Sequence, residues 1–537
     1  AFLVVSRLVT GQTVLDGVTS TDGNFTGGSV NRWYDNFLTT FLQTEPTGSG
    51  VILRFNNNNQ PATNNNVAGT YSIYQLLFGG GNNAARTISG NPIRFVNYLG
   101  SNPRIENQTA ATHTINTPIE GDGNPAYPLE FNPQAGTLII NGTINNQGSP
   151  VHVLGGAGRT LQLNGLISGA GGFDLQQNTF VILLGLNTYT GPTTLRAGVV
   201  RISSNVHPSL NGPFGNNAGN LFLAGGSIQN GTATFDRPIT ITGNGSNIDA
   251  IGAARTMIAP ISAGSGNWSF SVGSTFVFAQ GGQTLTLSGS ISNGAGNLGL
   301  SKIGNSTCIL TGNNSFSGGL SINGGILTFN TAASLPSGSP VFLGGGTLHV
   351  GAVAASSILN AGVLQMTGSS SIDLGTTTNP FELVFAGSGP TFTGTLTINN
   401  WSPINGKRIR VTNTSHISSV LSQIQFTGYP AGAEIRNGDE LWPVGIYTTV
   451  GSGSGSFDNP ASWIGGIVPP ANSSILVQTG FSLSVTSSIS LQSIDNAGTL
   501  TFTGSPTVQL GTSRVSKISN TGTLQLTNGT VSIGSFG

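Results

Sequence analysis

The sequence predicts an all-β protein folded as a right-handed parallel β-helix (β-solenoid), with about 24 residues per coil and almost no α-helix. Three observations predict this fold: a direct repeat of 24 residues near the end of the chain, a longer repeat in its middle, and the composition. Only 7% of the 537 residues are charged, and 81 are glycine, whereas an ordinary globular protein is about 25% charged. Hydrophobic residues make up 37% and fall in short β-branched runs such as GTLII at 136–140, which favours ordered strands over disorder.

The 24-residue repeat is the most direct sign of coils. Residues 494–500 read IDNAGTL and residues 518–524 read ISNTGTL, and each copy runs into residues that alternate in polarity. Alternation places apolar side chains on one face of a strand. A single coil cannot bury that face, so stacked coils must share a continuous core.

The longer repeat shows where insertions are tolerated. Residues 159–168 (RTLQLNGLIS) return as residues 283–292 (QTLTLSGSIS), 124 positions later. Residues 187–191 (NTYTG) return as residues 314–318 (NSFSG), 127 positions later. The offset changes in Gly- and Asn-rich turns, so the strands keep their phase. We expect Gly and Asn at the corners and ladders of Asn and Thr between coils.

These patterns suggest four parts. Residues 1–135 are predicted as an N-terminal solenoid part, and residues 136–445 as a repeat body. Residues 446–456, which end in GSGSGS, are predicted as a Gly/Ser hinge. Residues 457–537 form a predicted C-terminal solenoid part.

Charge and cysteine content exclude several classes. With 18 basic and 18 acidic residues, the chain lacks the cationic surplus that a nucleic-acid partner requires. Cys308 stands alone, so no disulfide can form within the chain, and its alignment with Val181 predicts a buried core residue. No run of about 18 apolar residues predicts a membrane span. The start, AFLVVSRLV, lacks Met and a basic segment, which fits a mature chain after removal of an export signal or a boundary within a longer one.

Residues 167–202 and 291–329 resemble the autotransporter-associated β-strand repeat. The resemblance rests on the positions of each copy that match the pattern of that family. In the first copy these are Gly169, Ala170, Gly171, Leu184, Asn187, Thr188, Tyr189, Thr190, Gly191, Thr194, Ala197 and Gly198; in the second they are Gly294, Ala295, Gly296, Leu310, Gly312, Asn314, Phe316, Gly318, Gly324 and Gly325. It implies β-helix coils in the exported passenger region of a bacterial surface protein.

Two further segments resemble parts of secreted repeat proteins. Residues 392–444 resemble the closing segment of repeat-rich surface proteins of Gram-negative bacteria. Residues 456–488 resemble a solenoid start common in secreted proteins of the Bacteroidetes type, which implies export by a type IX pathway. No sorting domain is recognised before Gly537, so this route is inferred from the resemblance alone.

Candidate sites are sparse. The densest group of polar residues surrounds the segment PIEGDGNP: Arg104, Glu106, His113, Glu120, Asp122 and Glu130. Glu120 and Asp122 offer the hard oxygen ligands that Ca²⁺ takes, although a charged loop between coils explains them better. The basic cluster Lys407, Arg408 and Arg410 is interpreted as a solvated strand edge, and the pair Asp439 and Glu440 as an exposed turn. No cofactor and no catalytic residue is predicted.

The function that follows is that of a non-enzymatic extracellular structural protein at the surface of a Gram-negative bacterium. We expect a fibre subunit that associates head to tail through terminal coils, or an adhesin that binds surface glycans, exported through outer-membrane secretion machinery with a cleaved signal. The alternative is a carbohydrate-active or carbohydrate-binding parallel β-helix. That alternative requires paired carboxylates in a groove and aromatic platforms from Trp33, Trp268 or Trp401.

Overall fold

The computed structural model describes most of the chain. The described residues are 13–17, 33–35, 40–42, 50–55, 62–65, 67, 69–79, 84–232, 234–272, 283–402, 405–429, 432–510, 518–527 and 532–535. They form a β-solenoid of about 18 turns with about 24 residues per turn and almost no helix, which confirms the predicted fold class. The chain divides into two compact units, Ala1–Ile326 and Leu327–Gly537.

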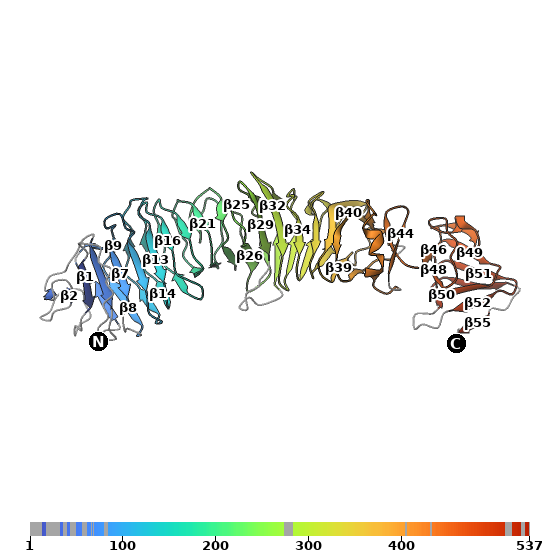
Figure 1. Ribbon diagram of the computed structural model, residues 1–537, viewed down its shortest axis with the longest axis horizontal. Helices are drawn as coiled ribbons and strands as arrows, with labels where there is room; N and C mark the ends of the chain where they lie inside the picture. The colour runs from blue at the N-terminus through green and yellow to red at the C-terminus, as the bar shows by residue number, and fades with distance from the viewer. Residues whose placement is uncertain are drawn as a thin grey trace. The chain divides into compact units, whose positions relative to one another are not determined.

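Successive coils of the first unit repeat the same three strands. One coil contains β13 (Leu129–Pro133), β14 (Thr137–Ile140) and β15 (Ile144–Asn145), and the next contains β16 (Val151–Val153), β17 (Thr160–Leu163) and β18 (Ile167–Ser168). Each strand pairs in parallel with its equivalent one coil later. Figure 1 shows β13 and β16 as neighbouring rungs.

Three faces of the first unit are built this way, and their remaining strands are as follows. The first sheet adds β1 (Thr13–Gly17), β2 (Trp33–Asp35), β3 (Thr40–Leu42), β4 (Val51–Phe55), β7 (Gln75–Phe78), β10 (Arg104–Asn107), β19 (Phe173–Leu175), β21 (Thr193–Leu195), β23 (Leu221–Leu223), β25 (Ile239–Ile241), β28 (Ile261–Ala263) and β31 (Ile291–Ser292). The second adds β5 (Ala62–Asn65), β8 (Arg86–Gly90), β11 (His113–Ile115), β20 (Phe180–Leu183), β22 (Val199–Ile202), β24 (Ser227–Asn230), β26 (Ser246–Ala250), β29 (Asn267–Val272), β32 (Asn297–Lys302) and β34 (Leu320–Ile322). The third face carries β6 (Tyr71–Ile73), β9 (Ile93–Phe95) and β12 (Ile119–Glu120), and later β27 (Arg255–Met257), β30 (Thr284–Leu287) and β33 (Thr307–Leu310).

Inward apolar residues form continuous stacks, as the alternating pattern predicts. Leu138, Leu161 and Val181 lie in register on β14, β17 and β20, and all three are fully buried. In the second copy Cys308 is in register with Leu285 and is buried, so its prediction as a core residue is confirmed. Burial in apolar surroundings raises the pKa of its thiol to about 12.

Side-chain ladders join the coils on the outside. Asn141 donates to Asn116 (2.8 Å) and Asn164 donates to Asn141 (2.7 Å), so three successive coils carry stacked asparagines at one corner. These bonds confirm the expected ladders for asparagine.

The repeated asparagine of the longer repeat has the same contact in both copies. Asn187 Oδ1 accepts the backbone N–H of Ile167 (2.8 Å), and Asn314 Oδ1 accepts that of Ile291 (2.9 Å). Asn187 also donates to the carbonyl of Pro213 (2.8 Å) and is 1% exposed. The buried side chain of Asn187 therefore supplies the hydrogen-bond acceptor for the first backbone N–H of the strand in the preceding coil.

Asn187→Ala is expected to destabilise the first unit by about 2 kcal/mol, because it leaves a buried N–H and a buried carbonyl unpaired. Asn164→Ala, on the exposed ladder, is the matched control and should cost well under 1 kcal/mol. Hydrogen exchange of residues around Ile167 measures both. Equal protection in the two variants would contradict this role of Asn187.

Corner glycines allow the coils to approach closely. A Cβ placed on Gly142 would lie 1.9 Å from the carbonyl oxygen of Thr117, and one on Gly165 would lie 1.9 Å from that of Gly142. In the second copy a Cβ on Gly289 would lie 2.1 Å from the carbonyl oxygen of Ala259. Glycine is needed here because of the close approach of two backbones.

The second unit begins with the same architecture. One face contains β36 (Val341–Leu343), β38 (Ser357–Met366), β40 (Phe381–Phe392) and β42 (Lys407–Val411), and the other contains β37 (Thr347–Val350), β39 (Ser370–Asp373), β41 (Leu396–Asn399) and β43 (Ile424–Phe426). β35 (Ile326–Phe329) lies at the boundary of the units. The helices within the described residues are short 3₁₀ turns: Ala332–Ser334, Ile417–Ser419, Leu421–Gln423 and Pro460–Ser462.

A hairpin ends this parallel stack. β44 (Ala433–Arg436) and β45 (Glu440–Pro443) pair antiparallel, and β45 pairs antiparallel with β42 at Glu440 and Arg410. The chain direction reverses at the edge that a further parallel rung would otherwise use.

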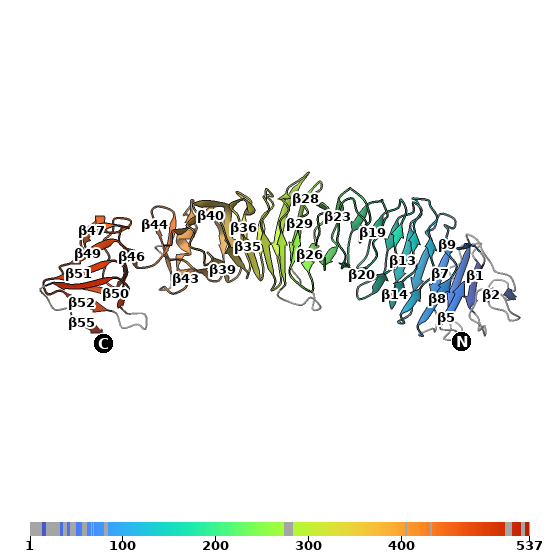
Figure 2. The same ribbon diagram turned by 180° about the vertical axis from the view of Figure 1, so that it is seen from behind.

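The last part of the second unit is a smaller stack with its own core. Its sheets are β46 (Ile446–Thr448), β48 (Ser473–Val477), β50 (Ile489–Asn496), β52 (Thr507–Leu510) and β55 (Ser532–Ser535), with β53 (Ile518–Asn520) beside β50, and β47 (Gly453–Ser456), β49 (Phe481–Val485), β51 (Thr499–Thr503) and β54 (Thr523–Thr527). Figure 2 shows β47, β49 and β51 one above another. Ile494 pairs with Ile518 and Leu500 with Leu524, so the 24-residue repeat is one coil.

The predicted hinge, residues 446–456, contains two strands. β46 pairs in parallel with β48, and β47 pairs in parallel with β49. The glycines of GSGSGS alternate with serines along β47, and a glycine-rich strand can still form its backbone hydrogen bonds. The domain boundaries at 135, 445 and 456 stay predictions.

Candidate binding surfaces

Three members of the predicted polar group meet on the outside of the first sheet. Arg104 on β10 lies 3.8 Å from Glu106 on the same strand and 3.3 Å from Glu130 on β13. The two carboxylates are 4% and 7% exposed. Amides complete the cluster: Gln75 and Gln108 donate to Glu106 (2.9 and 2.7 Å), and Asn102 donates to Glu130 (2.6 Å). Both carboxylates are thus engaged in ion pairs with Arg104 and in hydrogen bonds from side-chain amides.

His113 does not join this cluster, because it points into the core from β11. It is fully buried and stacks on Phe78 with ring centroids 4.1 Å apart. Burial, and secondarily the positive charge of Arg86, lower its pKa to about 4. This histidine is therefore neutral at pH 7.

The two calcium candidates have separate partners. Asp122 accepts hydrogen bonds from the backbone (3.1 Å) and the side chain of Asn97, whereas Glu120 accepts a long one from Gln147 (3.4 Å). Within the described ranges, no group of three or more His, Cys, Asp or Glu is placed to hold a metal ion. The calcium assignment to Glu120 and Asp122 stays a prediction.

Burial limits how much of the candidate aromatic platforms a ligand could contact. Trp401 is 6% exposed and packs edge-on against Trp442, Phe426 and Tyr429, so it does not offer the exposed platform that the carbohydrate-active alternative requires. Trp268 is half-buried and donates to the carbonyl of Ser265 (2.9 Å). The side chain of Trp33 lies outside the described residues.

The basic cluster is not a solvated edge, which corrects that interpretation: Lys407 is 3% exposed and donates to the carbonyl of Gly375, and the two arginines are ion-paired. Arg408 on β42 lies 2.6 Å from Glu440, and Arg410 lies 3.0 Å from Glu382 and 2.8 Å from Asp439. Glu440 is 4% exposed, so the Asp439–Glu440 pair is not a simple exposed turn either. These charges join β42 to the hairpin that ends the stack.

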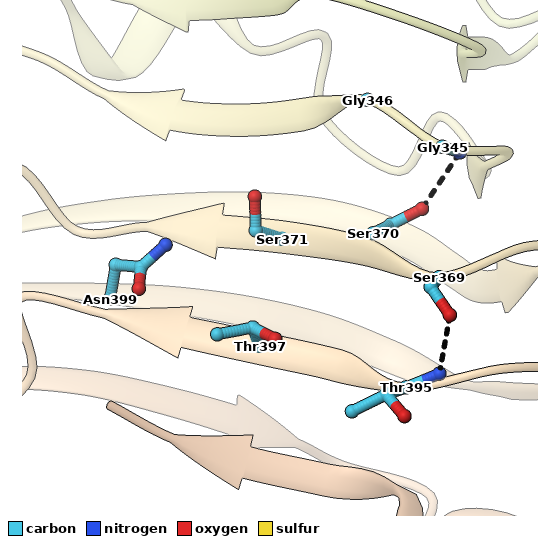
Figure 3. A pocket seen from close by; sticks show the side chains of 8 residues that line it. All are labelled: Gly345, Gly346, Ser369, Ser370, Ser371, Thr395, Thr397 and Asn399. Atoms are coloured by element: carbon cyan, nitrogen blue, oxygen red, sulfur yellow. Dashed lines mark hydrogen bonds between the residues drawn. The ribbon is translucent and has the colours of Figure 1, made fainter. Parts of the chain in front are cut away.

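The outer face of β37, β39 and β41 carries a groove that sequence reasoning missed. Figure 3 shows its lining: Gly345, Gly346, Ser369, Ser370, Ser371, Thr395, Thr397 and Asn399. The groove is open to solvent and has a volume of about 360 Å³. The sequence signal was the run of hydroxyl residues at outward positions of successive strands, which a search for charged clusters overlooks.

Buried Ser370 builds one end of this groove. Its hydroxyl accepts the N–H of Gly345 (2.9 Å) and donates to the carbonyl of Gly368 (2.9 Å), as Figure 3 shows for the first bond. Ser369 Oγ accepts the N–H of Thr395 (3.1 Å). Ser371 and Thr397 lie in register within this lining, and Thr347, on the preceding strand, shares a hydrogen bond with the hydroxyl of Ser371 (2.7 Å).

Among the described residues, no helix has the length and apolar character that a membrane crossing requires.

Two segments of this solenoid match a known family of passenger repeats. The family model described as passenger-associated-transport-repeat matches residues 181–202 and 300–329, within the repeats predicted at 167–202 and 291–329. The predicted resemblance to autotransporter passenger repeats is thereby confirmed.

The chain is similar to the protein named Adhesin BmaC autotransporter of Brucella suis biovar 1 (strain 1330). The two are 31% identical over 186 residues, which cover 33% of this chain and 4% of that protein. The chain therefore corresponds to a small part of that relative's length. No solved structure matches the chain.

Proposed function

We propose that this chain is part of the extracellular passenger of a non-enzymatic adhesin at the surface of a Gram-negative bacterium. The observation that carries the proposal is the pair of passenger-associated transport repeats within a solenoid similar to an autotransporter adhesin. The engagement of Glu106 and Glu130 in ion pairs supports a binding role over hydrolysis, since glycoside hydrolysis needs two carboxylates that reach the substrate.

The fold also suits passage through outer-membrane secretion machinery. Each coil contacts mainly its neighbours, so coils can form one after another as the chain emerges. With a single cysteine, no disulfide within the chain has to form or open on the way. A cleaved export signal and the type IX route remain proposals, and the second rests on the resemblance of residues 456–488.

Binding of the purified, fluorescently labelled chain to cultured mammalian cells tests the adhesive function. We expect saturable binding that unlabelled chain competes and that acid-unfolded chain does not show. Absence of saturable binding to cells and to matrix glycoproteins would overturn the proposal. Turnover of a polysaccharide panel, lost in Glu106→Gln and Glu130→Gln, would support the carbohydrate-active alternative instead.

We also propose head-to-tail self-association, as in a fibre, through the edge of β54. Within the described residues β54 pairs with β51 alone. Leu524 and Leu526 continue the stacks of buried Leu500 and Phe502, yet they are 44% and 58% exposed. A parallel strand from a second copy would cover them and pair with the backbone groups on the side of β54 that faces away from β51.

The double substitution Leu524→Lys and Leu526→Lys is expected to abolish self-association, because it places charges where a second copy must bury apolar side chains. Sedimentation velocity over a concentration series measures this. The matched control is Gln525→Lys, which adds charge on the outer face of the same strand. A chain that stays monomeric at every concentration, or a double variant that associates like the original, would refute self-association through β54.

A further inference from the structure

The groove on β37, β39 and β41 has the chemistry of a carbohydrate site. Within the described residues, the hydroxyls of Thr395 and Thr397 form no hydrogen bond, so both can donate and accept toward a ligand. The amide oxygen of Asn399 is held by the hydroxyl of Thr427 (2.6 Å). That bond fixes the orientation of the amide and leaves its N–H₂ group as a donor.

The lining carries no charged side chain, which restricts the ligand. Asp373 is in register with Asn399 on the neighbouring strand, and its Oδ1 accepts the N–H of Gly375 (2.9 Å) and the amide of Asn400 (2.6 Å). An acidic glycan would find no cation here to offset the loss of its hydration. A neutral sugar exchanges its hydroxyl–water bonds for hydroxyl–hydroxyl bonds at little cost.

The geometry of the face favours an extended chain. Thr347, Ser371 and Thr397 stand in register on three consecutive rungs, and neighbouring strands lie about 4.8 Å apart. Their polar groups therefore form a straight row across the strands, and sugar units of an extended β-linked glycan repeat at a similar distance. Gly345 and Gly346, which have no side chains, line one end of the groove.

We propose that this groove binds a neutral, β-linked glycan laid across the rungs, with Ser371, Thr397 and Asn399 as its principal hydrogen-bonding residues. The assignment rests on the adhesive function proposed above and names its ligand class and its site. Because the groove is shallow and lacks an aromatic platform, a single copy binds on the order of millimolar affinity, and repeated copies on a cell surface supply avidity.

Saturation-transfer NMR and titration calorimetry with cellohexaose, laminarihexaose and chitohexaose test the proposal on the full chain. Thr397→Val keeps the shape and the strand preference but removes the hydroxyl, and it is expected to weaken binding about five-fold. Ser371→Tyr fills the groove from an outward strand position and is expected to abolish binding. Thr501→Val, an outward half-buried threonine on β51, is the matched control and should bind as the original does.

The outcomes separate this site from the general function. Failure of all three hexasaccharides to bind, or unchanged binding by folded Ser371→Tyr, would overturn the groove as a glycan site. Preference for polygalacturonate over the neutral hexasaccharides would overturn the ligand class. Saturable cell binding without glycan binding would overturn the groove as a glycan site but support the adhesive function. Glycan binding without saturable cell binding would support the groove as a glycan site and overturn the adhesive function.

Discussion

Gly165→Val is expected to unfold the coils around it and to cost more than about 4 kcal/mol, the range of severe core substitutions. A Cβ at this position would lie 1.9 Å from the carbonyl oxygen of Gly142 and 2.9 Å from that of Asn141. Both contacts are with backbone, which no side-chain rotation can relieve. The two coils must move apart, which breaks parallel hydrogen bonds and opens the core between them.

Gly156→Ala is the control for this substitution. A Cβ on Gly156 meets nothing within 4 Å, so alanine should be neutral there or slightly stabilising through the unfolded chain. Hydrogen exchange resolved by segment is the suitable measurement, since long repeat arrays do not unfold in a single two-state step. Protection around residues 137–168 should collapse in Gly165→Val and persist in Gly156→Ala. Equal protection in both would contradict the close-approach argument.

The same glycine shows what the sequence predicts well. Gly165 and Gly289 occupy equivalent positions of RTLQLNGLIS and QTLTLSGSIS, and each lies where a Cβ would strike the preceding coil. A repeat is a local pattern that every coil must satisfy, so it reveals the coil length, the inward residues and the corners. Cys308 was placed correctly for that reason.

Tertiary contacts without a repeating pattern were predicted less well. Trp401 gave no sign in the sequence that it packs against Trp442, because the hairpin that brings them together interrupts the repeat. Arg410 and Glu382 are 28 residues apart and meet only through coil stacking. The groove escaped notice since its residues are uncharged and belong to three separate coils.

Acidification is expected to destabilise the first unit through His113, by about 3 kcal/mol between pH 6.5 and pH 4. The folded chain holds the pKa of this imidazole at about 4, below its ordinary value of 6.5, chiefly because burial disfavours the charged form. Below pH 6.5 the unfolded chain therefore binds a proton that the folded chain does not. The contribution of neutral His113 to the stability of the first unit is fully present above pH 6.5. It decreases as the pH drops toward 4, and below pH 4 it changes no further.

The hydrogen bonds around His113 explain why protonation of its imidazole is unfavourable in the folded chain. The hydroxyl of Thr109 donates to Asn107 Oδ1 (3.0 Å), so it accepts the proton of His113 Nε2 (2.7 Å). His113 Nδ1 is then the unprotonated nitrogen, and it is buried without a partner. A second proton there would create a buried cation with no acceptor, close to the positive charge of Arg86.

His113→Phe is expected to flatten this part of the pH dependence, because phenylalanine keeps the stacking on Phe78 and cannot titrate. The matched control is His416→Gln, an exposed histidine of the second unit, which should leave the pH profile unchanged. Hydrogen exchange of residues 86–140 at pH 7, 5.5 and 4 compares the three chains. If His113→Phe loses protection toward pH 4 as steeply as the original chain, the acid sensitivity has its source elsewhere. If His113→Phe keeps its protection, protonation of this one buried imidazole sets the lowest pH at which these coils stay folded.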